Sequence, residues 1–350
     1  MRAAALVKHG GPDAIEIVEL PERDPGPGEV RLTVHASALN HLDVWVRRGW
    51  PGLNLKMPHV LGADVAGAVE SVGPGVKCWS VGDPALVTPG FGCGGCAACL
   101  GGDESLCDDY KIYGEGVPGG MSERFVVPAS HLLPMPRRLS FAEAAALPLT
   151  LMTAWRMLMV RGHLRPGETV LIQAAGSGVG SVGLQIASAA GARVIAGASS
   201  EEKRLHAERL GAHAAIDTSI PGWRKEVKRV LDGGGVDLVF EHVGGAVFEE
   251  SLTTLRRGGR LVTCGATAGA AAAVDLRHLF FKQLSLIGST MGSRADLAPA
   301  LALVRRGKIS PVVYKVLALD EVREAQRLLE EREAIGKVVL DVSGTAQEKP

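Results

Sequence analysis

The 350-residue chain carries 38 lysine and arginine residues against 38 aspartate and glutamate residues, so its formal net charge is zero. This balance gives no electrostatic support for nucleic acid binding or for attachment to an anionic membrane. The length exceeds what one hydrophobic core usually holds and predicts two domains. The apolar run near the N-terminus, AAALV, is too short for a signal peptide, so we expect a cytoplasmic protein. The one charge-free window long enough for a bilayer, 169–192, contains glutamines, serines and several glycines, which argues against a membrane helix.

The first 150 residues are typical of a mostly β, turn-rich domain. Apolar or alternating segments predict strands at residues 3–7, 14–18, 30–38 and 65–72, and Pro-Gly pairs separate them. Ser140 and Glu143 have the spacing of a capping box and predict a helix that continues to Met159.

Four cysteines lie in the glycine-rich segment GFGCGGCAACLGGDESLC with the spacing C-x2-C-x2-C-x7-C. Four thiolates so close together can surround one zinc ion with Zn–S distances of about 2.3 Å, and such a closed site is structural because no coordination position is open. A pair of disulfides is disfavoured because nothing else in the chain is typical of a secreted protein. A redox pair is disfavoured because no thioredoxin-like context is present. The predicted ligands are Cys93, Cys96, Cys99 and Cys107. The isolated Cys78 and Cys264 are expected as small buried side chains.

From residue 169 the pattern changes to strands that alternate with helices of about 10–15 residues, which predicts an α/β unit with a doubly wound parallel sheet. Predicted strands include TVLIQ, RVIAG, 214–217, VDLVFEHV, RLVTCG and LSLIGS. The pattern breaks near Ser293, and the chain closes on the strand-like KVVLDV. We therefore expect a catalytic domain at 1–150, a dinucleotide-binding domain at 151–292, and a return to the catalytic domain at 293–350.

The turn between TVLIQ and the following helix contains G-x-G-x-x-G at Gly178, Gly180 and Gly183. Glycines there let the backbone approach a pyrophosphate, and the N-terminus of the helix supplies N–H donors. The pattern alone is weak, but a strand before it and a helix and strand after it favour a dinucleotide site over simple helix packing.

The acidic residue that would hold the ribose hydroxyls of NAD about 20 residues later is missing, since Ala198 stands there. Ser199, Lys203 and Arg204 follow and could bind a 2′-phosphate, which predicts NADP(H) in preference to NAD(H). The alternative stays open that Ser199 and Glu202 only cap a helix and that the two cations lie on a solvated face.

The chain resembles the zinc-containing alcohol dehydrogenase and quinone oxidoreductase superfamily, the medium-chain dehydrogenases/reductases. The resemblance rests on PGPGEVRLTVHASALNHLD, LGADVAGAVESVGPGVKCWSVGDPALV, the cysteine loop, GGMSERFVVPASHLLPMP, AAGSGVGSVG and GKVVL. It implies a barrel-like β domain that carries the cysteine loop, a Rossmann domain, and an active site in a cleft between them. It also implies a homodimer or homotetramer that pairs through an edge of the Rossmann sheet, for which LSLIGS is the candidate. The expected cofactor contacts are His41, Ala175, Gly178, Val179, Gly180, Ser199, Lys203, Arg204 and Gly265.

The chain departs from the zinc-dependent enzymes at the positions that correspond to the ligands of a catalytic zinc. These positions hold Asn40, Ala63 and Leu149, and the proton-relaying hydroxyl is replaced by Leu42. The segment from Asn40 to Asp43 instead resembles the N-x-x-D stretch of quinone oxidoreductases, which lack catalytic zinc. A site improvised from His41, Asp43 and Asp64 is chemically admissible but disfavoured, because the resemblance gives these residues other roles.

These observations predict an enzyme that transfers hydride between NADP(H) and a quinone, enone or related carbonyl without catalytic zinc. Such acceptors are already electrophilic, so hydrogen bonds and positioning can suffice. Asn40, Asp43 and Asp64 are the predicted catalytic residues, although both aspartates could be purely structural. Two alternatives stay open: an alcohol or aldehyde dehydrogenase with a non-standard metal site, and a non-catalytic NADPH-binding sensor.

Overall fold

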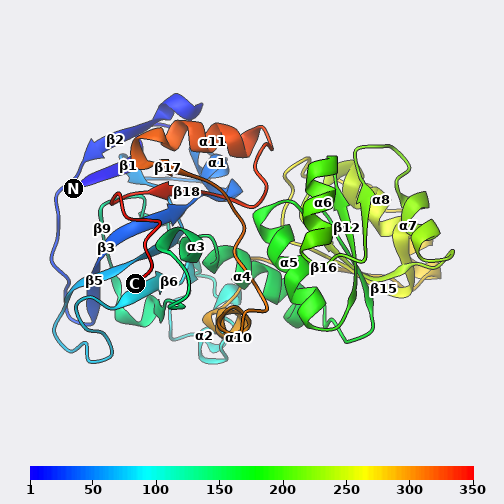
Figure 1. Ribbon diagram of the computed structural model, residues 1–350, viewed down its shortest axis with the longest axis horizontal. Helices are drawn as coiled ribbons and strands as arrows, with labels where there is room; N and C mark the ends of the chain where they lie inside the picture. Colours follow the sequence, from blue (N-terminus) through cyan, green and yellow to red (C-terminus); the bar gives the residue numbers. More distant parts are fainter. The chain divides into compact units, whose positions relative to one another are not determined.

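The structure, a computed structural model, describes all 350 residues and consists of two compact units (Figure 1). The first unit contains Met1–Leu149, Ser293–Ala295 and Pro311–Pro350. The second unit contains Thr150–Gly292 and Asp296–Ser310. The chain thus leaves the first unit, builds the second, and returns to complete the first.

The first unit is mostly β. Its strands are β1 (Arg2–Leu6), β2 (Ile15–Glu19), β3 (Glu29–Ala38), β4 (His59–Val60), β5 (Asp64–Val72), β6 (Pro84–Val87), β7 (Gly90–Phe91), β8 (Lys111–Ile112), β9 (Arg124–Pro128), β10 (Leu132–Pro134), β17 (Val313–Ala318) and β18 (Lys337–Asp341). Seven of them form one sheet in the order β10-β6-β5-β3-β18-β17, with β9 paired to β3. Two smaller sheets, β2-β1-β4 and β7-β8, complete the unit. The strands predicted near 3–7, 14–18, 30–38 and 65–72 are confirmed within one or two residues.

Strand β3 brings three distant parts of the chain together at one end. It pairs antiparallel with both β5 and β18, and Ala38 at its C-terminal end lies opposite Asp64 and Val339. In antiparallel pairs the end of one strand meets the start of its neighbour. The residues just after β3 therefore lie beside the first residues of β5 and β18.

The helix predicted from Ser140 to Met159 is interrupted in the structure. The capping box is confirmed: Glu143 N–H donates to Ser140 Oγ at 3.2 Å, and Ser140 N–H donates to the Glu143 carboxylate at 2.8 Å. Helix α3 (Phe141–Ala145) then ends, and α4 (Pro148–Trp155) begins at a proline, which lacks an N–H and disfavours a helical residue before it. The π-helix η4 (Arg156–Arg161) follows α4.

The second unit contains a six-stranded, wholly parallel sheet in the order β13-β12-β11-β14-β15-β16, which confirms the predicted doubly wound class. Its strands are β11 (Thr169–Ile172), β12 (Arg193–Ala198), β13 (Ala214–Asp217), β14 (Val236–Glu241), β15 (Leu255–Thr263) and β16 (Ser285–Gly288). Its connecting helices are α5 (Gly178–Ala189), α6 (Glu201–Arg209), α7 (Arg224–Val230), α8 (Gly245–Thr254) and α9 (Leu276–Phe281). Right-handed crossovers place α5 and α6 on one face of the sheet and α7 and α8 on the other, as Figure 1 shows. The strand order reverses between β11 and β14, where such sheets bind ligands.

The remaining helices of the chain are α1 (His41–Arg48), α2 (Ala97–Leu100), α10 (Arg294–Arg305) and α11 (Val322–Glu330), with short 3-10 turns η1 (Pro12–Ala14), η2 (Glu104–Leu106), η3 (Ala129–His131) and η5 (Leu319–Glu321). The sequence pattern predicted no element between Ser293 and the final strand, yet α10, β17 and α11 lie there. No helix in the structure is both long and apolar enough to cross a membrane.

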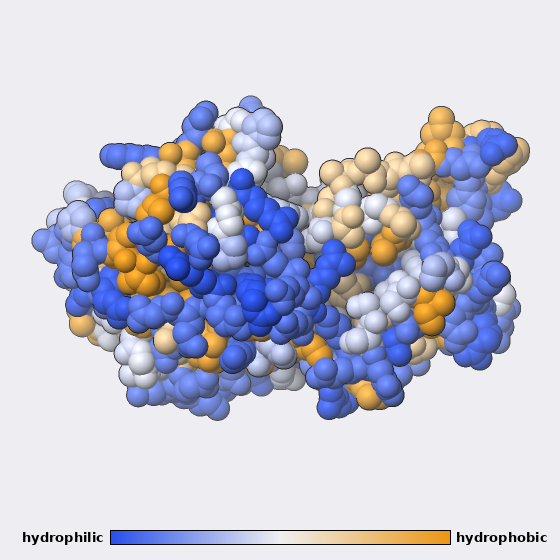
Figure 2. All heavy atoms as spheres, turned by 90° about the horizontal axis from the view of Figure 1, so that it is seen from above, coloured by the Kyte–Doolittle hydropathy of each residue, from blue (hydrophilic) through white to orange (hydrophobic).

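Strand β16 is an edge of the parallel sheet, as expected of the LSLIGS segment. Leu286 on this strand is 38% exposed, and Leu276, Phe280 and Phe281 on α9 are at least 60% exposed. Figure 2 shows that one face of the molecule carries hydrophobic patches within a largely hydrophilic surface. Subunit pairing along β16 stays a prediction, which sedimentation equilibrium would contradict by finding a monomer at micromolar concentration.

Candidate functional site

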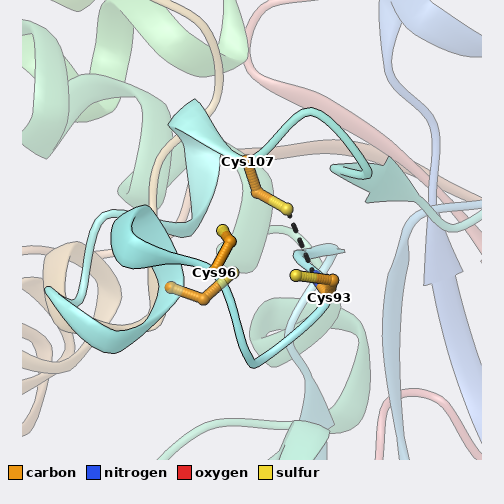
Figure 3. Close-up of side chains that lie close together, drawn as sticks. Cys93, Cys96 and Cys107 are labelled. Carbon is orange, nitrogen blue, oxygen red and sulfur yellow. Dashed lines mark hydrogen bonds between the residues drawn. The ribbon is translucent and has the colours of Figure 1, made fainter.

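The four predicted cysteine ligands converge in the loop between β7 and β8 of the first unit. Their sulfur atoms all lie within 4.8 Å of one another, and none forms a disulfide (Figure 3). A tetrahedral zinc site with Zn–S bonds of about 2.3 Å places its sulfurs about 3.8 Å apart, so small side-chain rotations close the cluster around an ion. The donor set therefore fits a closed, structural zinc site.

The loop acts in opposite directions on two of the thiols: burial raises the pKa of Cys99 to about 12, whereas backbone donors favour the thiolate of Cys93. The N–H groups of Gly95 and Cys96 lower the pKa of the Cys93 thiol to about 7, and Cys93 N–H donates to Cys107 Sγ at 3.3 Å. Of the two isolated cysteines, Cys78 is exposed, so its predicted burial is wrong, whereas Cys264 is only partly exposed and burial raises the pKa of its thiol to about 12.

Asn40 occupies the N-cap of α1 but does not cap that helix with its side chain. The N–H of Asp43 donates to the backbone oxygen of Asn40 at 3.0 Å, and only the reverse half of a capping box forms, from Asn40 N–H to Asp43 Oδ2 at 2.7 Å. The carboxamide instead turns inward, where Nδ2 donates to Asp64 Oδ2 at 2.8 Å. The side-chain oxygen of an N-cap asparagine normally accepts a hydrogen bond from one of the first helical N–H groups. The Asn40 side chain instead contacts Asp64.

The carboxylate of Asp64 is the centre of a buried polar network. The residue has no exposed surface, and its Oδ1 accepts the backbone N–H of Leu149 at 2.7 Å. Its Oδ2 accepts hydrogen bonds from Asn40 and from the ammonium of Lys337, which lies 2.9 Å away. Lys337 Nζ also donates to Asn40 Oδ1 at 2.5 Å, so three residues from β5, β18 and the end of β3 form a closed triangle.

Sequence reasoning missed Lys337. The residue is 5% exposed and lies 297 positions from Asn40 along the chain. The sequence does place a lysine at the start of the apolar strand KVVLD. A lysine buried in such a strand requires a partner of opposite charge, which is the signal that could have indicated its role. Nothing local in the sequence shows that the partner is Asp64.

Asp43 lies beside this network and is held by backbone donors. Its oxygens accept from Asn40 N–H at 2.7 Å and from Gly62 N–H at 3.1 Å. Gly62 has φ +98°, and a Cβ there would lie 2.6 Å from the Met121 side chain, so only glycine fits this turn. Burial raises the pKa of Asp43 to about 6, whereas these hydrogen bonds and the charge of Lys337 act in the opposite direction.

The raised pKa of Asp43 predicts a pH-dependent stability. At pH values between 3.8, the ordinary pKa of an aspartate, and about 6, its pKa in the folded protein, Asp43 is protonated in the folded state and ionised in the unfolded state. Asp43 therefore stabilises the folded protein at low pH, and this contribution is lost as the pH rises through about 6. Relative to Asp43→Asn, which does not titrate, wild type should lose on the order of 1–2 kcal/mol between pH 5 and pH 7.5. Urea unfolding of both proteins at the two pH values measures the difference. A constant difference would contradict the raised pKa.

His41 lies on the first turn of α1 and is half-buried. Its ring meets Trp45 edge-on, with centroids 5.3 Å apart. Burial lowers its pKa, and the charges of Arg332 and Arg48 lower it further. Glu330, which pairs with Arg48 at 2.6 Å, acts in the opposite direction on the pKa of His41.

The glycine-rich turn of the second unit has the geometry of a nucleotide site. Ser177 caps α5, its Oγ accepting Gly180 N–H at 3.0 Å. A Cβ on Gly180 would lie 2.3 Å from the carbonyl oxygen of Ala174, so glycine is needed for the close approach of helix and strand. Ala175 is wholly buried behind the turn, and Val179 lies on the first turn of α5. Gly265 follows β15, where a Cβ would lie 3.0 Å from the His242 carbonyl oxygen. All these positions lie at the carboxyl ends of the parallel strands.

The residues after β12 differ from the sequence interpretation in two respects. Ser200, not Ser199, is the N-cap of α6, with its Oγ accepting Lys203 N–H at 3.4 Å, so the alternative in which Ser199 and Glu202 cap this helix is wrong. Ser199 is exposed. Arg204 forms an ion pair with Asp217 at 2.7 Å, which places its guanidinium against β13. The methylene stem of Lys203 packs on the glycine-rich turn, 2.8 Å from where a Gly176 Cβ would lie.

Both halves of the chain match known protein families. Residues 178–306 match the zinc-binding dehydrogenase family, and residues 26–137 match the GroES-like domain of alcohol dehydrogenases. An NAD-dependent alcohol dehydrogenase of Sulfurisphaera tokodaii is 33% identical over 97% of this chain and 99% of its own length. The chain belongs to the zinc-binding medium-chain dehydrogenase/reductase superfamily. As a member of this superfamily it is an NAD(P)-dependent oxidoreductase.

Other proteins that the chain resembles include reductases of coenzyme A thioesters as well as alcohol dehydrogenases by name. The acryloyl-coenzyme A reductase of Metallosphaera sedula is 34% identical over 96% of this chain and 99% of its own. A solved structure described as an NAD-dependent alcohol dehydrogenase is 46% identical, covers 98% of this chain and 100% of its own, and superposes with a TM-score of 0.94. Neither these nor the Sulfurisphaera relative is named a quinone oxidoreductase, so the predicted quinone-oxidoreductase branch is not specifically supported.

The medium-chain family also raises the question of a catalytic zinc, and the residues present do not fit one. Asn40 is engaged with Asp64 and Lys337, while Ala63 and Leu149 offer no side-chain donor. The improvised set fares no better, because each oxygen of Asp43 and Asp64 already accepts a hydrogen bond. His41, Asp43 and Asp64 form no metal-binding group of the kind that the four cysteines form.

Proposed function

We propose that the enzyme reduces the carbon–carbon double bond of a small α,β-unsaturated carbonyl compound, of the enoyl thioester class, with a nicotinamide cofactor. The observation that supports this most is the Asn40–Asp64–Lys337 triangle, which places an ammonium beside a carboxamide. By the sequence resemblance, Asn40 stands at a position where zinc-dependent enzymes carry a ligand of the catalytic metal. The acryloyl-coenzyme A reductase likeness supports the same substrate class.

The chemistry of an enoyl thioester suits these residues. When bound, the reduced nicotinamide supplies a hydride, and conjugation makes the β-carbon of the substrate electrophilic without a metal. Negative charge then develops on the carbonyl oxygen, where a fixed N–H donor stabilises it, and the α-carbon of this enolate takes a proton from water to complete the reduction. Asn40 Nδ2 is such a donor, because its carboxamide is held on two sides and it is 7% exposed. Asp43 and Asp64 would act by holding the donor and its loop, since both are buried and already hydrogen-bonded.

A second candidate, an alcohol dehydrogenase, is favoured by a different observation. The 46%-identical structure and the Sulfurisphaera relative both carry that name. Oxidation of a simple alcohol requires that its hydroxyl lose a proton, which zinc-dependent enzymes promote by metal coordination. In this chain the proton would have to leave without a metal donor set, so we expect slow turnover of unactivated primary alcohols.

Steady-state kinetics separate the two candidates. NADPH or NADH oxidation should be followed with acryloyl-CoA and crotonyl-CoA, and NADP⁺ or NAD⁺ reduction with ethanol and benzyl alcohol. We expect enoyl thioester reduction that survives EDTA while the thiolate-bound zinc is retained. Alcohol oxidation that EDTA abolishes and zinc restores would overturn the proposal and establish the second candidate. Tight cofactor binding without turnover of any substrate would instead favour the non-catalytic sensor.

A further inference from the structure

We infer that Lys337 is a positioning residue, whose ammonium holds the Asn40 carboxamide away from the helix end and presents its second Nδ2–H to a ligand. No relative's name and no sequence motif assigned this role to Lys337. The inference deepens the proposed function and rests on it in so far as that ligand is the substrate carbonyl.

The chemistry of the two partners determines which way the carboxamide faces. An ammonium only donates hydrogen bonds and an ionised carboxylate only accepts them. Lys337 at 2.5 Å must therefore face Oδ1, and Asp64 at 2.8 Å must face Nδ2. An isolated asparagine could turn by half a revolution at little cost, but here the reversed orientation would oppose donor to donor and acceptor to acceptor.

One N–H of Asn40 is left weakly engaged by this arrangement. The Asp64 contact uses one hydrogen of Nδ2, and the other faces the Ala38 carbonyl oxygen at 3.5 Å, at the long limit for a hydrogen bond. A donor held in place but poorly satisfied gains more from a ligand oxygen than a mobile one, because no ordering is needed when the ligand arrives.

Lys337 is the residue of the triangle that keeps the Asn40 side chain from capping α1. Without the ammonium, Oδ1 would lack a partner in a buried site, and the nearest conventional use of an N-cap oxygen is the N–H of Asp43 on α1. The carboxamide should then swing back to cap the helix. Asp64 would lose its cationic partner at the same time, which lowers the stability of the fold. The test must therefore separate a loss of stability from a loss of Asn40 orientation.

The test uses variants of the full-length protein. Lys337→Met removes the ammonium, Lys337→Arg keeps a cation, and Lys337→Met combined with Asp64→Asn removes both buried charges in case the single variant does not fold. Lys315→Met is the matched control, since Lys315 is exposed on the neighbouring strand β17 opposite Val338. Asn40→Ala supplies the second arm of a double-mutant cycle.

With crotonyl-CoA, Lys337→Met or the charge-neutral double variant should lower kcat about 10- to 100-fold while KM for the cofactor changes little. Lys337→Arg should recover part of the loss, and Lys315→Met should match wild type. In an Asn40→Ala background the same Lys337 change should have little further effect on kcat, because the two residues act as one unit. Additive losses, or losses that follow the unfolding temperature alone, would overturn the inference.

A crystal structure of Lys337→Met, or of the charge-neutral double variant if the single variant does not fold, gives a readout that needs no substrate. We expect the Asn40 side chain within hydrogen-bond distance of Asp43 N–H, and an unmoved carboxamide would refute the positioning role. If wild type fails to reduce any enoyl thioester, the proposed function fails, whereas this structural arm still decides the role of Lys337.

Discussion

Replacing Cys107 by serine should remove the bound zinc and lower the free energy of unfolding by several kcal/mol. Cys107 is the most buried of the four cysteines, and it ties the far end of the loop to the backbone of Cys93. The loop between β7 and β8 has little regular structure beyond one turn of α2 and the short η2, so metal–thiolate bonds are its main source of order. Losing one thiolate opens the coordination shell, and serine does not replace it as a soft ligand.

Cys78→Ser is the control for this experiment, because Cys78 is exposed and lies outside the cluster. It should change stability by no more than about 0.5 kcal/mol. Elemental analysis should give one zinc per subunit for wild type and for Cys78→Ser, and none for Cys107→Ser. Two zinc ions per wild-type subunit would show a metal site beyond the four cysteines. An unchanged unfolding midpoint in zinc-free Cys107→Ser would show that the cluster does not stabilise the fold.

The architecture could be predicted from sequence because its signals are local. Each strand or helix is indicated by its own segment, as in TVLIQ, the glycine-rich turn and RVIAG. Short connections between these elements leave few ways to arrange parallel strands. The break at Pro148 was visible as a residue but was outweighed by the apolar run around it. Helix α11 was overlooked although its buried Val322, Ala325 and Leu328 have helical spacing.

The candidate site could be predicted only in part, because its contacts join distant parts of the chain. Asn40, Asp43 and Asp64 were found through a resemblance, and their buried positions were not visible in the sequence. Lys337 was missed because strand pairing across β3 brings it to Asn40, and a single sequence does not reveal that pairing. The N-cap of α6 could not be assigned from the sequence either, although Ser199 and Ser200 are adjacent. Both serines offer a hydroxyl, and only the backbone conformation shows that Ser200 is the N-cap.

The second large effect that we expect is a preference for NADPH over NADH, and the structure indicates which residues could cause it. We propose that wild type prefers NADPH because Ala198 at the end of β12 leaves the ribose position without an acidic residue. Since Ser200 caps α6, the exposed Ser199 hydroxyl is not required by the helix. The stem of Lys203 packs on the glycine-rich turn, where the cofactor is expected, so Lys203 is the candidate cation for the 2′-phosphate. A charge-assisted hydrogen bond contributes about 1.5–3 kcal/mol, or roughly 10- to 150-fold in affinity.

Two substitutions test this preference from opposite directions. Lys203→Met should lower kcat/KM for NADPH about 10- to 100-fold while that for NADH changes little, because only the 2′-phosphate loses its partner. Arg209→Gln, an exposed cation on the same helix, should leave both values unchanged. Ala198→Asp should invert the preference, because a carboxylate repels the 2′-phosphate and accepts the free ribose hydroxyls of NADH. Ala198 is buried, so the unfolding temperature must be measured alongside to separate repulsion from damage to the fold. Equal kcat/KM for NADPH and NADH in wild type would contradict the assignment, since it would mean that neither Ser199 nor Lys203 distinguishes the two cofactors.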